Sequence, residues 1–352
     1  MSSTRILVTG GAGFVGSNLA IQLREQSSGS TVVAMDNLYR RGSELTLPRL
    51  NAHGVRFHYG DVRDPASFPN GPFDLVVECS AEPSAMAGVA GSPDYLVHTN
   101  LVGAYHCLEQ ARKWNAGVLF LSSSRVYPVA PLEAHPWIEQ ETRFSWQEAG
   151  AAGISPRGVT EALPMNGARS LYGWTKFAAE QLIEEYRATF GLKVIVDRCG
   201  VLAGPWQFGK VDQGFVALWI QAHIFGRPLD YIGYGGTGKQ VRDVLHVDDL
   251  GDLVKGQLGD FERWDGWVGN VSGGLENSVS LVELTRLCRE ITGGQVQLRP
   301  IAERRPGDLR IYIADCARLH ARTKWRARRS VRKIVEDHAA WALQTRDRLQ
   351  FG

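Results

Sequence analysis

Short apolar runs alternate with amphipathic stretches through the first 200 residues of the chain. The stretches between the runs have helical spacing, most clearly over residues 94–113. Because strands that alternate with helices form parallel βαβ units, this rhythm predicts a parallel sheet that is buried on both faces. The predicted strands cover residues 5–9, 31–35, 55–59, 75–79 and 117–122.

The pattern changes after residue 127. Residues 128–170 are rich in Pro, Gly, Ala and Trp and have little periodicity, which predicts a long functional loop. We therefore predict an α/β fold, in which a Rossmann-type doubly wound parallel sheet carries a smaller, interleaved α/β substrate-binding domain. The later predicted elements are a strand at 193–198 and helices at 172–190, 247–258, 280–292 and 328–349.

Charge and composition exclude several classes of function. The 352 residues contain 39 Lys plus Arg and 37 Asp plus Glu, so the net charge of +2 gives no general attraction to nucleic acid or an anionic membrane. The basic run 318–333 is interleaved with apolar residues, which favours a solvated helix face over a nucleic-acid contact. The chain has no 18-residue apolar run, no signal-peptide pattern and no CxxC pair among its five cysteines, which predicts a cytoplasmic protein with reduced thiols.

A glycine-rich turn joins the first strand to the first helix. Gly10, Gly13 and Gly16 have the spacing Gly-x-x-Gly-x-x-Gly, and Phe14 and Val15 begin the helix. Glycines permit a tight turn and a close approach to a pyrophosphate, which the helix N-terminus also attracts. Glycines alone would fit an ordinary turn between a strand and a helix as well.

Asp36, at the end of the second strand, favours a dinucleotide over an ordinary turn. A carboxylate at this position can accept both ribose hydroxyls of NAD. It repels the additional phosphate of NADP, although Arg40 and Arg41 could attract that phosphate, and we expect NAD. Asp61 and Val62 follow the third strand and are placed to meet the adenine edge, and a helix cap is the alternative role for Asp61.

Tyr172 and Lys176 lie one helical turn apart on one face of a predicted helix. An ammonium group and the positive ring of bound NAD⁺ both lower the pKa of a phenol, which can then act as a general base toward an alcohol. The segment 121–127 (Leu-Ser-Ser-Ser-Arg-Val-Tyr) ends an apolar strand, where ligands collect in open α/β sheets.

These motifs, in this order, resemble those of the extended short-chain dehydrogenase/reductase superfamily, within it the NAD-dependent epimerase/dehydratase family. The resemblance implies that Ser123 is the catalytic hydroxyl, that Tyr172 is the base, and that Lys176 assists it and grips the nicotinamide ribose. It also implies a structural, cofactor-proximal Asn100 and a homodimer formed through residues 94–113 and 172–190. The residues expected to bind the cofactor are Gly10, Gly13, Phe14, Val15, Gly16, Asp36, Asn37, Asp61, Val62, Asn100, Tyr172 and Lys176.

The two residues that directly follow the expected catalytic serine indicate which type of reaction the chain could catalyse. Family members that dehydrate sugars carry an Asp-Glu pair where this chain has Ser124 and Arg125. Because an arginine donates no proton at neutral pH, a 4,6-dehydratase is disfavoured. The same argument counts more weakly against a decarboxylase, which leaves an epimerase or a net reductase.

The second half of the chain resembles nucleotide-sugar enzymes. Residues 238–249 resemble an epimerase signature, which implies that Arg242 pairs with the sugar-linked diphosphate, and residues 304–308 resemble an Arg-Pro-Gly-Asp element near the nucleotide. Residues 204–219 resemble a segment of the CDP-tyvelose (CDP-paratose) 2-epimerases, which oxidise and re-reduce C2 of the sugar. The residues expected to bind substrate are Ser124, Arg125, Gln207, Gln213, Arg242, Arg305 and Asp308.

Some features leave the substrate open. Residues 78–82 (Glu-Cys-Ser-Ala-Glu) replace a common His-x-Ala-Ala stretch, and Arg125 could bind substrate or only form a salt-bridged wall. A UDP-hexose 4-epimerase and a non-catalytic dinucleotide-binding protein remain alternatives, and no metal is expected. We assign residues 1–198 with 240–262 to an NAD-binding domain, and 199–239 with 263–352 to a nucleotide-sugar-binding domain.

Overall fold

The computed structural model describes residues 4–26, 29–147, 152–209 and 214–349. The chain divides into two compact units. The first contains residues 1–126, 171–199 and 250–269, and the second contains residues 127–170, 200–249 and 270–352. Across the described ranges, no helix combines the length and the apolar character that crossing a membrane requires.

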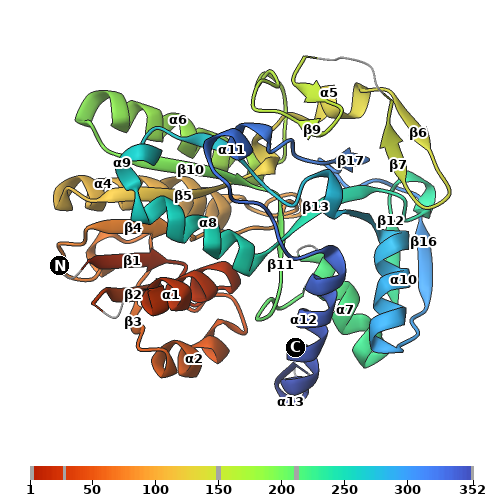
Figure 1. The fold of residues 1–352 in the computed structure, drawn as a ribbon, viewed down its shortest axis with the longest axis horizontal. Coiled ribbons are helices and arrows are strands. Elements are labelled where there is room, and N and C mark those ends of the chain that lie inside the picture. Colours follow the sequence, from red (N-terminus) through yellow and green to blue (C-terminus); the bar gives the residue numbers. More distant parts are fainter. Residues whose placement is uncertain (1–3, 27–28, 148–151, 210–213, 350–352) are drawn as a thin grey trace. The chain divides into compact units, whose positions relative to one another are not determined.

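A seven-stranded sheet forms the centre of the first unit (Figure 1). Its order is β14-β10-β5-β4-β1-β2-β3, and the ladders from β10 to β3 are parallel. This arrangement confirms the predicted Rossmann-type sheet. Its strands are β1 (Arg5–Thr9), β2 (Thr31–Asp36), β3 (Arg56–Tyr59), β4 (Leu75–Glu78), β5 (Gly117–Ser123), β10 (Val194–Cys199) and β14 (Val268–Val271).

Helices cover both faces of this sheet. α4 (Gly103–Trp114) and α6 (Leu171–Phe190) pack on one face, in a core with Leu7 and Phe120. α1 (Phe14–Gln26) and α8 (Val247–Gly259) lie against each other, since a Cβ on Gly251 of α8 would collide with Gln22 of α1. The strands supply apolar side chains to both faces, as the continuous apolar runs predicted.

The second unit contains a smaller mixed sheet. Its central strand β13 (Val241–His246) pairs in parallel with β11 (Val201–Ala203) and β17 (Ile311–Tyr312), and antiparallel with β15 (Ser278–Ser280). Three helices share the core of this unit. They are α7 (Phe215–Phe225), α10 (Leu281–Thr292) and α12 (Val331–Gln344).

The other elements are short. They are η1 (Ser43–Thr46), α2 (Leu47–Ala52), η2 (Pro65–Ser67), α3 (Asp94–Val97), η3 (His98–Val102), η4 (Ser124–Val126), α5 (Val129–Ala134), β6 (Trp137–Glu139), β7 (Phe144–Trp146), β8 (Ile154–Ser155), β9 (Gly158–Val159), β12 (Leu229–Ile232), η5 (Tyr234–Gly236), α9 (Phe261–Trp264), η6 (Leu275–Asn277), β16 (Leu298–Ile301), α11 (Ala317–Arg322) and α13 (Arg346–Leu349). η3 is a π-helical turn between α3 and α4.

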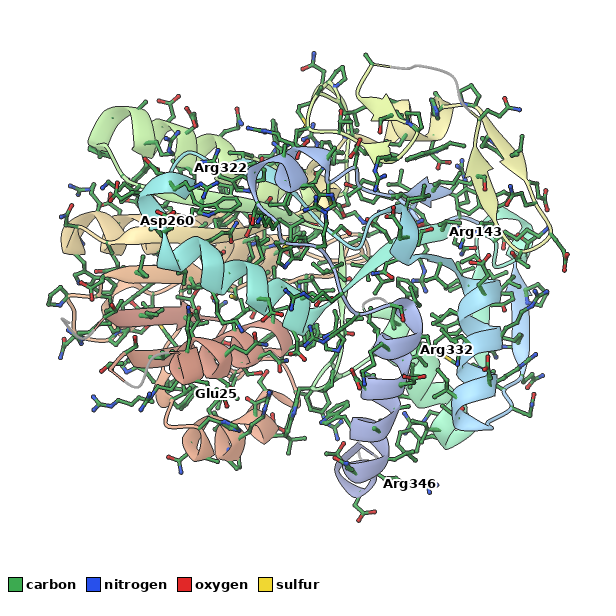
Figure 2. All side chains as sticks on the ribbon, in the orientation of Figure 1. Glu25, Arg143, Asp260, Arg322, Arg332 and Arg346 are labelled. Atoms are coloured by element: carbon green, nitrogen blue, oxygen red, sulfur yellow. The ribbon has the colours of Figure 1, made fainter. Side chains whose placement is uncertain are left out.

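The prediction of one long loop over 128–170 is wrong. The segment contains α5 and two small hairpins, β6 with β7 and β8 with β9. Phe144 of β7 packs against Val241 and Ile311. Arg143, which is labelled in Figure 2, donates to the carboxylate of Glu283 at 2.8 Å. These elements are held by partners far along the chain, so a local pattern does not show them. They pack in the second unit, as do residues 240–249, whereas the sequence pattern placed both segments in the first.

The basic run 318–333 is not one continuous helix. α11 ends at Arg322, and α12 begins only at Val331. The carboxylate of Asp249 accepts the backbone N–H groups of Arg328 and Arg329 at 3.1 and 2.9 Å, and the Arg329 guanidinium at 2.6 Å. These bonds replace helical hydrogen bonds in the non-helical connection between α11 and α12.

Asp197, inside β10, makes the stability of the protein depend on pH. Burial raises the pKa of Asp197 from 3.8 to about 7, although Gln257 and Trp267 donate hydrogen bonds to its carboxyl group. The folded protein therefore keeps this proton at pH values where the unfolded chain releases it. The stability contributed by the protonated group is present below pH 4 and is lost as the pH rises to about 7.

We therefore predict that Asp197→Asn removes this dependence. Between about pH 4 and 7, the free energy of unfolding of the original protein should fall relative to that of the variant. The difference should change by up to roughly 1.4 kcal/mol per pH unit. Urea unfolding at pH 5 and pH 7 measures the difference. An identical difference at both pH values would contradict a shifted carboxyl group.

Candidate active site

The glycine turn lies between β1 and α1. Gly10 has a φ of +63°, and a Cβ on this residue would lie 2.8 Å from the backbone oxygen of Cys79. A Cβ on Gly16 would collide with the backbone oxygen of Gly10. These two glycines are therefore required by the fold itself.

Gly13 differs from its two neighbours in the motif. A Cβ on Gly13 would have only the Gly10 oxygen nearby, at 3.1 Å. Its missing side chain therefore leaves space at the start of α1, beside the half-buried Phe14 and Val15. This is the space that a pyrophosphate approaching a helix N-terminus requires.

Asp36 is tied to the glycine turn. Its Oδ1 accepts the N–H of Leu38 at 2.8 Å, and its Oδ2 accepts the N–H of Ala12 at 3.1 Å. Burial raises the pKa of Asp36, and these N–H groups oppose that change. The carboxylate thus has a fixed orientation beside the turn, which fits a group that accepts ribose hydroxyls.

Asp61 is held by two partners. Asn37 donates to its Oδ2 at 2.9 Å, and Arg63 donates to the same oxygen at 2.6 Å. Burial alone would raise the pKa of Asp61, but these hydrogen bonds lower it to about 2. The alternative interpretation of Asp61 as a helix cap is wrong, because Asp64 caps η2. Val62 is buried next to it, and contact of either residue with adenine stays a prediction.

The expected catalytic residues come from β5 and α6 of the first unit. Ser123 ends β5, where its hydroxyl accepts the N–H of Arg125 at 3.2 Å. A Cβ on Gly173 would collide with the backbone oxygen of Arg125, so the first turn of α6 lies directly on the turn after β5. The half-buried Tyr172, in the first turn of α6, is therefore close in space to the end of β5.

Lys176 is completely enclosed in the first unit. Its Nζ lies 3.5 Å from Oε2 of Glu78 and 4.4 Å from the ring centroid of Phe120. The exposed fractions of Lys176 and Glu78 are only 2% and 1%. Burial lowers the pKa of Lys176, but Glu78, Tyr172 and Cys79 together outweigh this effect, with Glu78 the largest of the three, and the pKa is raised.

Glu78 was visible in the sequence only as a departure from the family stretch over 78–82. Its position at the carboxyl end of a buried strand was a signal that it would face the centre of the site. Glu180 of α6 is another buried acid, and no motif in the sequence indicates it. It accepts the hydroxyl of Ser122 at 2.5 Å and the guanidinium of Arg198 at 2.7 Å, which fixes α6 against β5 and β10.

Asn100 lies in the π-helical turn η3. Its Oδ1 accepts the N–H of Glu82 at 2.8 Å, and its amide nitrogen donates to Glu82 and to Thr175, both at 3.1 Å. The side chain therefore connects the segment after β4 to α6. A direct contact with the cofactor stays a prediction.

Two of the expected substrate-binding residues pair in the second unit. Arg242 donates to Oδ1 of Asp308 at 2.7 Å and to the backbone oxygen of Leu309. Arg305 is half-buried in the same turn, where its oxygen accepts the N–H of Asp308. Gln207 is buried and donates to Leu202.

The other expected substrate residues are elsewhere. Ser124 and Arg125 are half-buried in the first unit, in η4. Gln213 lies outside the described residues.

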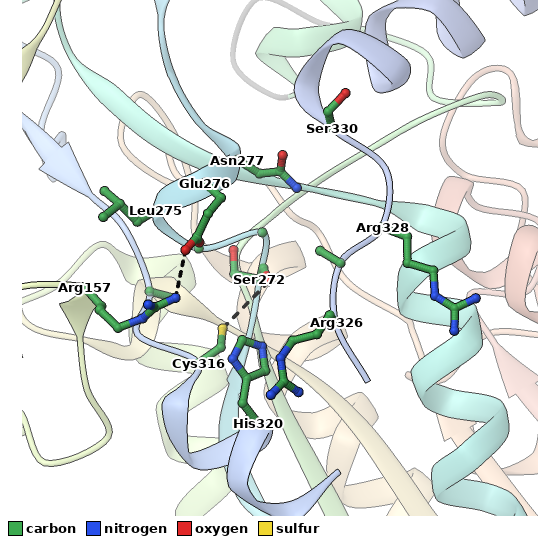
Figure 3. A pocket seen from close by; sticks show the side chains of 14 residues that line it. Arg157, Ser272, Leu275, Glu276, Asn277, Cys316, His320, Arg326, Arg328 and Ser330 are labelled. Atoms are coloured by element: carbon green, nitrogen blue, oxygen red, sulfur yellow. Dashed lines mark hydrogen bonds and ion pairs between the residues drawn. The ribbon is translucent and has the colours of Figure 1, made fainter. Parts of the chain in front are cut away.

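A cavity of about 450 Å³ lies elsewhere in the second unit (Figure 3). Its wall includes Arg326 and Arg328 from the connection between α11 and α12. Arg157 also lines the cavity and pairs with Glu276 at 2.9 Å. It contains none of the residues expected to bind substrate, so the sequence motifs do not point to it.

Comparisons with known proteins agree with the motifs. Residues 6–258 match the model of the NAD dependent epimerase/dehydratase family. The chain is 30% identical to CDP-paratose 2-epimerase of Salmonella typhi, over 96% of this chain and 98% of that protein. It is also 30% identical to dTDP-glucose 4,6-dehydratase of Mycolicibacterium smegmatis, over 71% and 67%. The fold resembles UDP-glucose 4-epimerase from Bifidobacterium longum in complex with NAD⁺ and UDP, with a TM-score of 0.76, 22% identity, and coverage of 98% and 99%.

Proposed function

The chain belongs to the NAD-dependent epimerase/dehydratase family, and on this basis we propose that it inverts C2 of a CDP-linked sugar of the tyvelose or paratose type. The observation that carries the choice of epimerisation is Ser124-Arg125 directly after Ser123, in place of a proton-donating pair. Similarity over nearly the full length to a CDP-paratose 2-epimerase supports the choice of C2.

The first unit has the residues that NAD requires. The turn at Gly13 would accept the pyrophosphate, Asp36 the adenosine ribose, and Lys176 the nicotinamide ribose. When bound, NAD would supply a hydride acceptor in its oxidised form and a hydride donor in its reduced form. Since the two transfers cancel, the cofactor can remain bound through successive turnovers.

The side chains of the first unit handle the proton and the oxygen. Tyr172 takes the proton of the C2 hydroxyl as this carbon is oxidised, and Ser123 hydrogen-bonds the same oxygen. The resulting 2-keto sugar turns before it is reduced on its other face, when Tyr172 returns the proton. Lys176 contributes positive charge on the same face of α6 as Tyr172.

The second unit is proposed to hold the nucleotide diphosphate. Arg242 presents a planar set of donors that suits phosphate oxygens, and Asp308 holds this guanidinium at 2.7 Å. Arg305 lies in the same turn of the chain and adds a second positive charge.

Incubation with single substrates tests the proposal. Purified protein should interconvert CDP-paratose and CDP-tyvelose, followed by proton NMR, and should leave UDP-glucose unchanged. Denaturation of the protein should release NAD without NADP. Conversion of UDP-glucose to UDP-galactose would instead support the alternative, a UDP-hexose 4-epimerase that uses the same Ser123, Tyr172 and Lys176.

We further propose a homodimer through α4 and α6. Tyr105 of α4 and Trp174 and Phe190 of α6 are large apolar side chains with exposed fractions of 42%, 46% and 52%. Exposed aromatic side chains on two helices that pack together are typical of a subunit interface. Sedimentation equilibrium should give twice the chain mass of 38.8 kDa, and a single-chain mass would exclude this dimer.

A further inference from the structure

The buried ion pair between Glu78 and Lys176 is a feature that the proposed mechanism does not use. Glu78 is the last residue of β4, and its neighbours in the sheet are Thr9 of β1 and Phe120 of β5. Glu78 therefore lies on a central strand, at the end of the sheet formed by the carboxyl ends of the strands. An acid in this position is costly to bury unless a positive group compensates it.

The environment of Lys176 makes Glu78 its main electrostatic partner. The other titratable groups that act on its ammonium are Tyr172, on its own helix, and Cys79, directly after β4. The charges of Glu78 and Lys176 also act on the thiol of Cys107 in α4. Burial raises the pKa of both thiols, so they stay neutral at physiological pH. Burial also raises the pKa of Glu78, and the Lys176 ammonium opposes that change, so the two buried charges stabilise each other.

We propose that Glu78 is a positioning residue, whose carboxylate fixes both the place and the positive charge of the Lys176 ammonium group. The inference rests on the proposed function, in which Lys176 assists Tyr172. The 3.5 Å contact directs Nζ from one side, and the ring of Phe120 limits its movement from another. Without the carboxylate, Lys176 would lose its proton at lower pH, because burial disfavours an uncompensated charge.

The test compares Glu78→Gln with the unchanged protein in the NAD-loaded state. The alkaline limb of the kcat profile should move to lower pH by on the order of one unit in the variant, because Lys176 then loses its proton earlier. Glu78→Asp keeps the charge on a shorter side chain, so its alkaline limb should stay close to that of the unchanged protein. Asp197→Asn is the matched control, since it removes another buried carboxyl group of the same sheet, and its alkaline limb should stay in place.

A second readout does not depend on turnover. The ¹³C NMR signal of the Lys176 Cε atom, in protein made with ¹³C-labelled lysine, reports the titration of the buried amine, and its midpoint should also fall by about one pH unit in Glu78→Gln. If Lys176 shifts in this way while no CDP-sugar is epimerised, the proposed function fails and the role of Glu78 stands. If both readouts of Glu78→Gln match the unchanged protein, the proposal is overturned. Should Glu78→Gln not fold, Glu78→His, which also lacks the negative charge at neutral pH, takes its place, and an unshifted Lys176 titration in that variant overturns the proposal.

Discussion

Tyr172→Phe is expected to lower kcat by about 10²- to 10⁴-fold, the range that a general base contributes. The substitution removes only the phenolic oxygen, and the ring keeps its place at the start of α6. Because the glycine turn and Asp36 are unchanged, the variant should still release NAD on denaturation. Epimerisation followed by NMR and the NAD content of the purified variant measure the two effects separately.

Tyr59→Phe provides the control for this variant. Tyr59 ends β3 and its side chain is exposed, so the loss of its phenolic oxygen should leave the kcat per folded active site unchanged. Turnover that persists in Tyr172→Phe would remove the base from the mechanism. Loss of NAD from Tyr172→Phe would show instead that the phenol serves binding.

Gly13→Ala is expected to abolish NAD retention and lower activity by at least 10²-fold, with little effect on folding. The added methyl group would approach only the Gly10 oxygen, at 3.1 Å, but would fill the space proposed for the pyrophosphate. Equilibrium dialysis with NAD and thermal unfolding of the cofactor-free protein measure the two quantities.

Gly16→Ala is the matched comparison. Its methyl group would collide with the backbone of Gly10, so this variant should lose stability by several kcal/mol before binding is considered. Normal NAD binding by Gly13→Ala would contradict the assignment of the turn to the pyrophosphate. Equal destabilisation of the two variants would show that the motif serves only the fold.

The central sheet could be predicted because its signals are local. Each apolar run between 5 and 122 forms a strand near the expected position, since strands buried on both faces need continuous apolar sequence. The hairpins within 128–170 could not be predicted, because strands of two or three residues have no period of their own. The break at 323–330 depends on Asp249, a partner almost eighty residues away.

The candidate site shows the same division. Tyr172 and Lys176 could be placed on one face of a helix because their spacing is that of one turn. The partner of Lys176 could not be identified, since Glu78 is 98 residues away and meets it only in the folded sheet. The pairing of Arg242 with Asp308 is equally a product of the fold, as these residues belong to separate segments of the second unit.

The fate of the hydrogen on C2 tests the account most directly. A CDP-paratose molecule that carries deuterium at C2 should be converted in ordinary water to CDP-tyvelose with the deuterium still on C2, and single turnovers should be slower than those of the unlabelled sugar. Deuterium retention with a slowed reaction means that the hydrogen leaves this carbon and returns to it without contact with solvent. Loss of the deuterium to water, or inversion at an unlabelled rate, would contradict the mechanism.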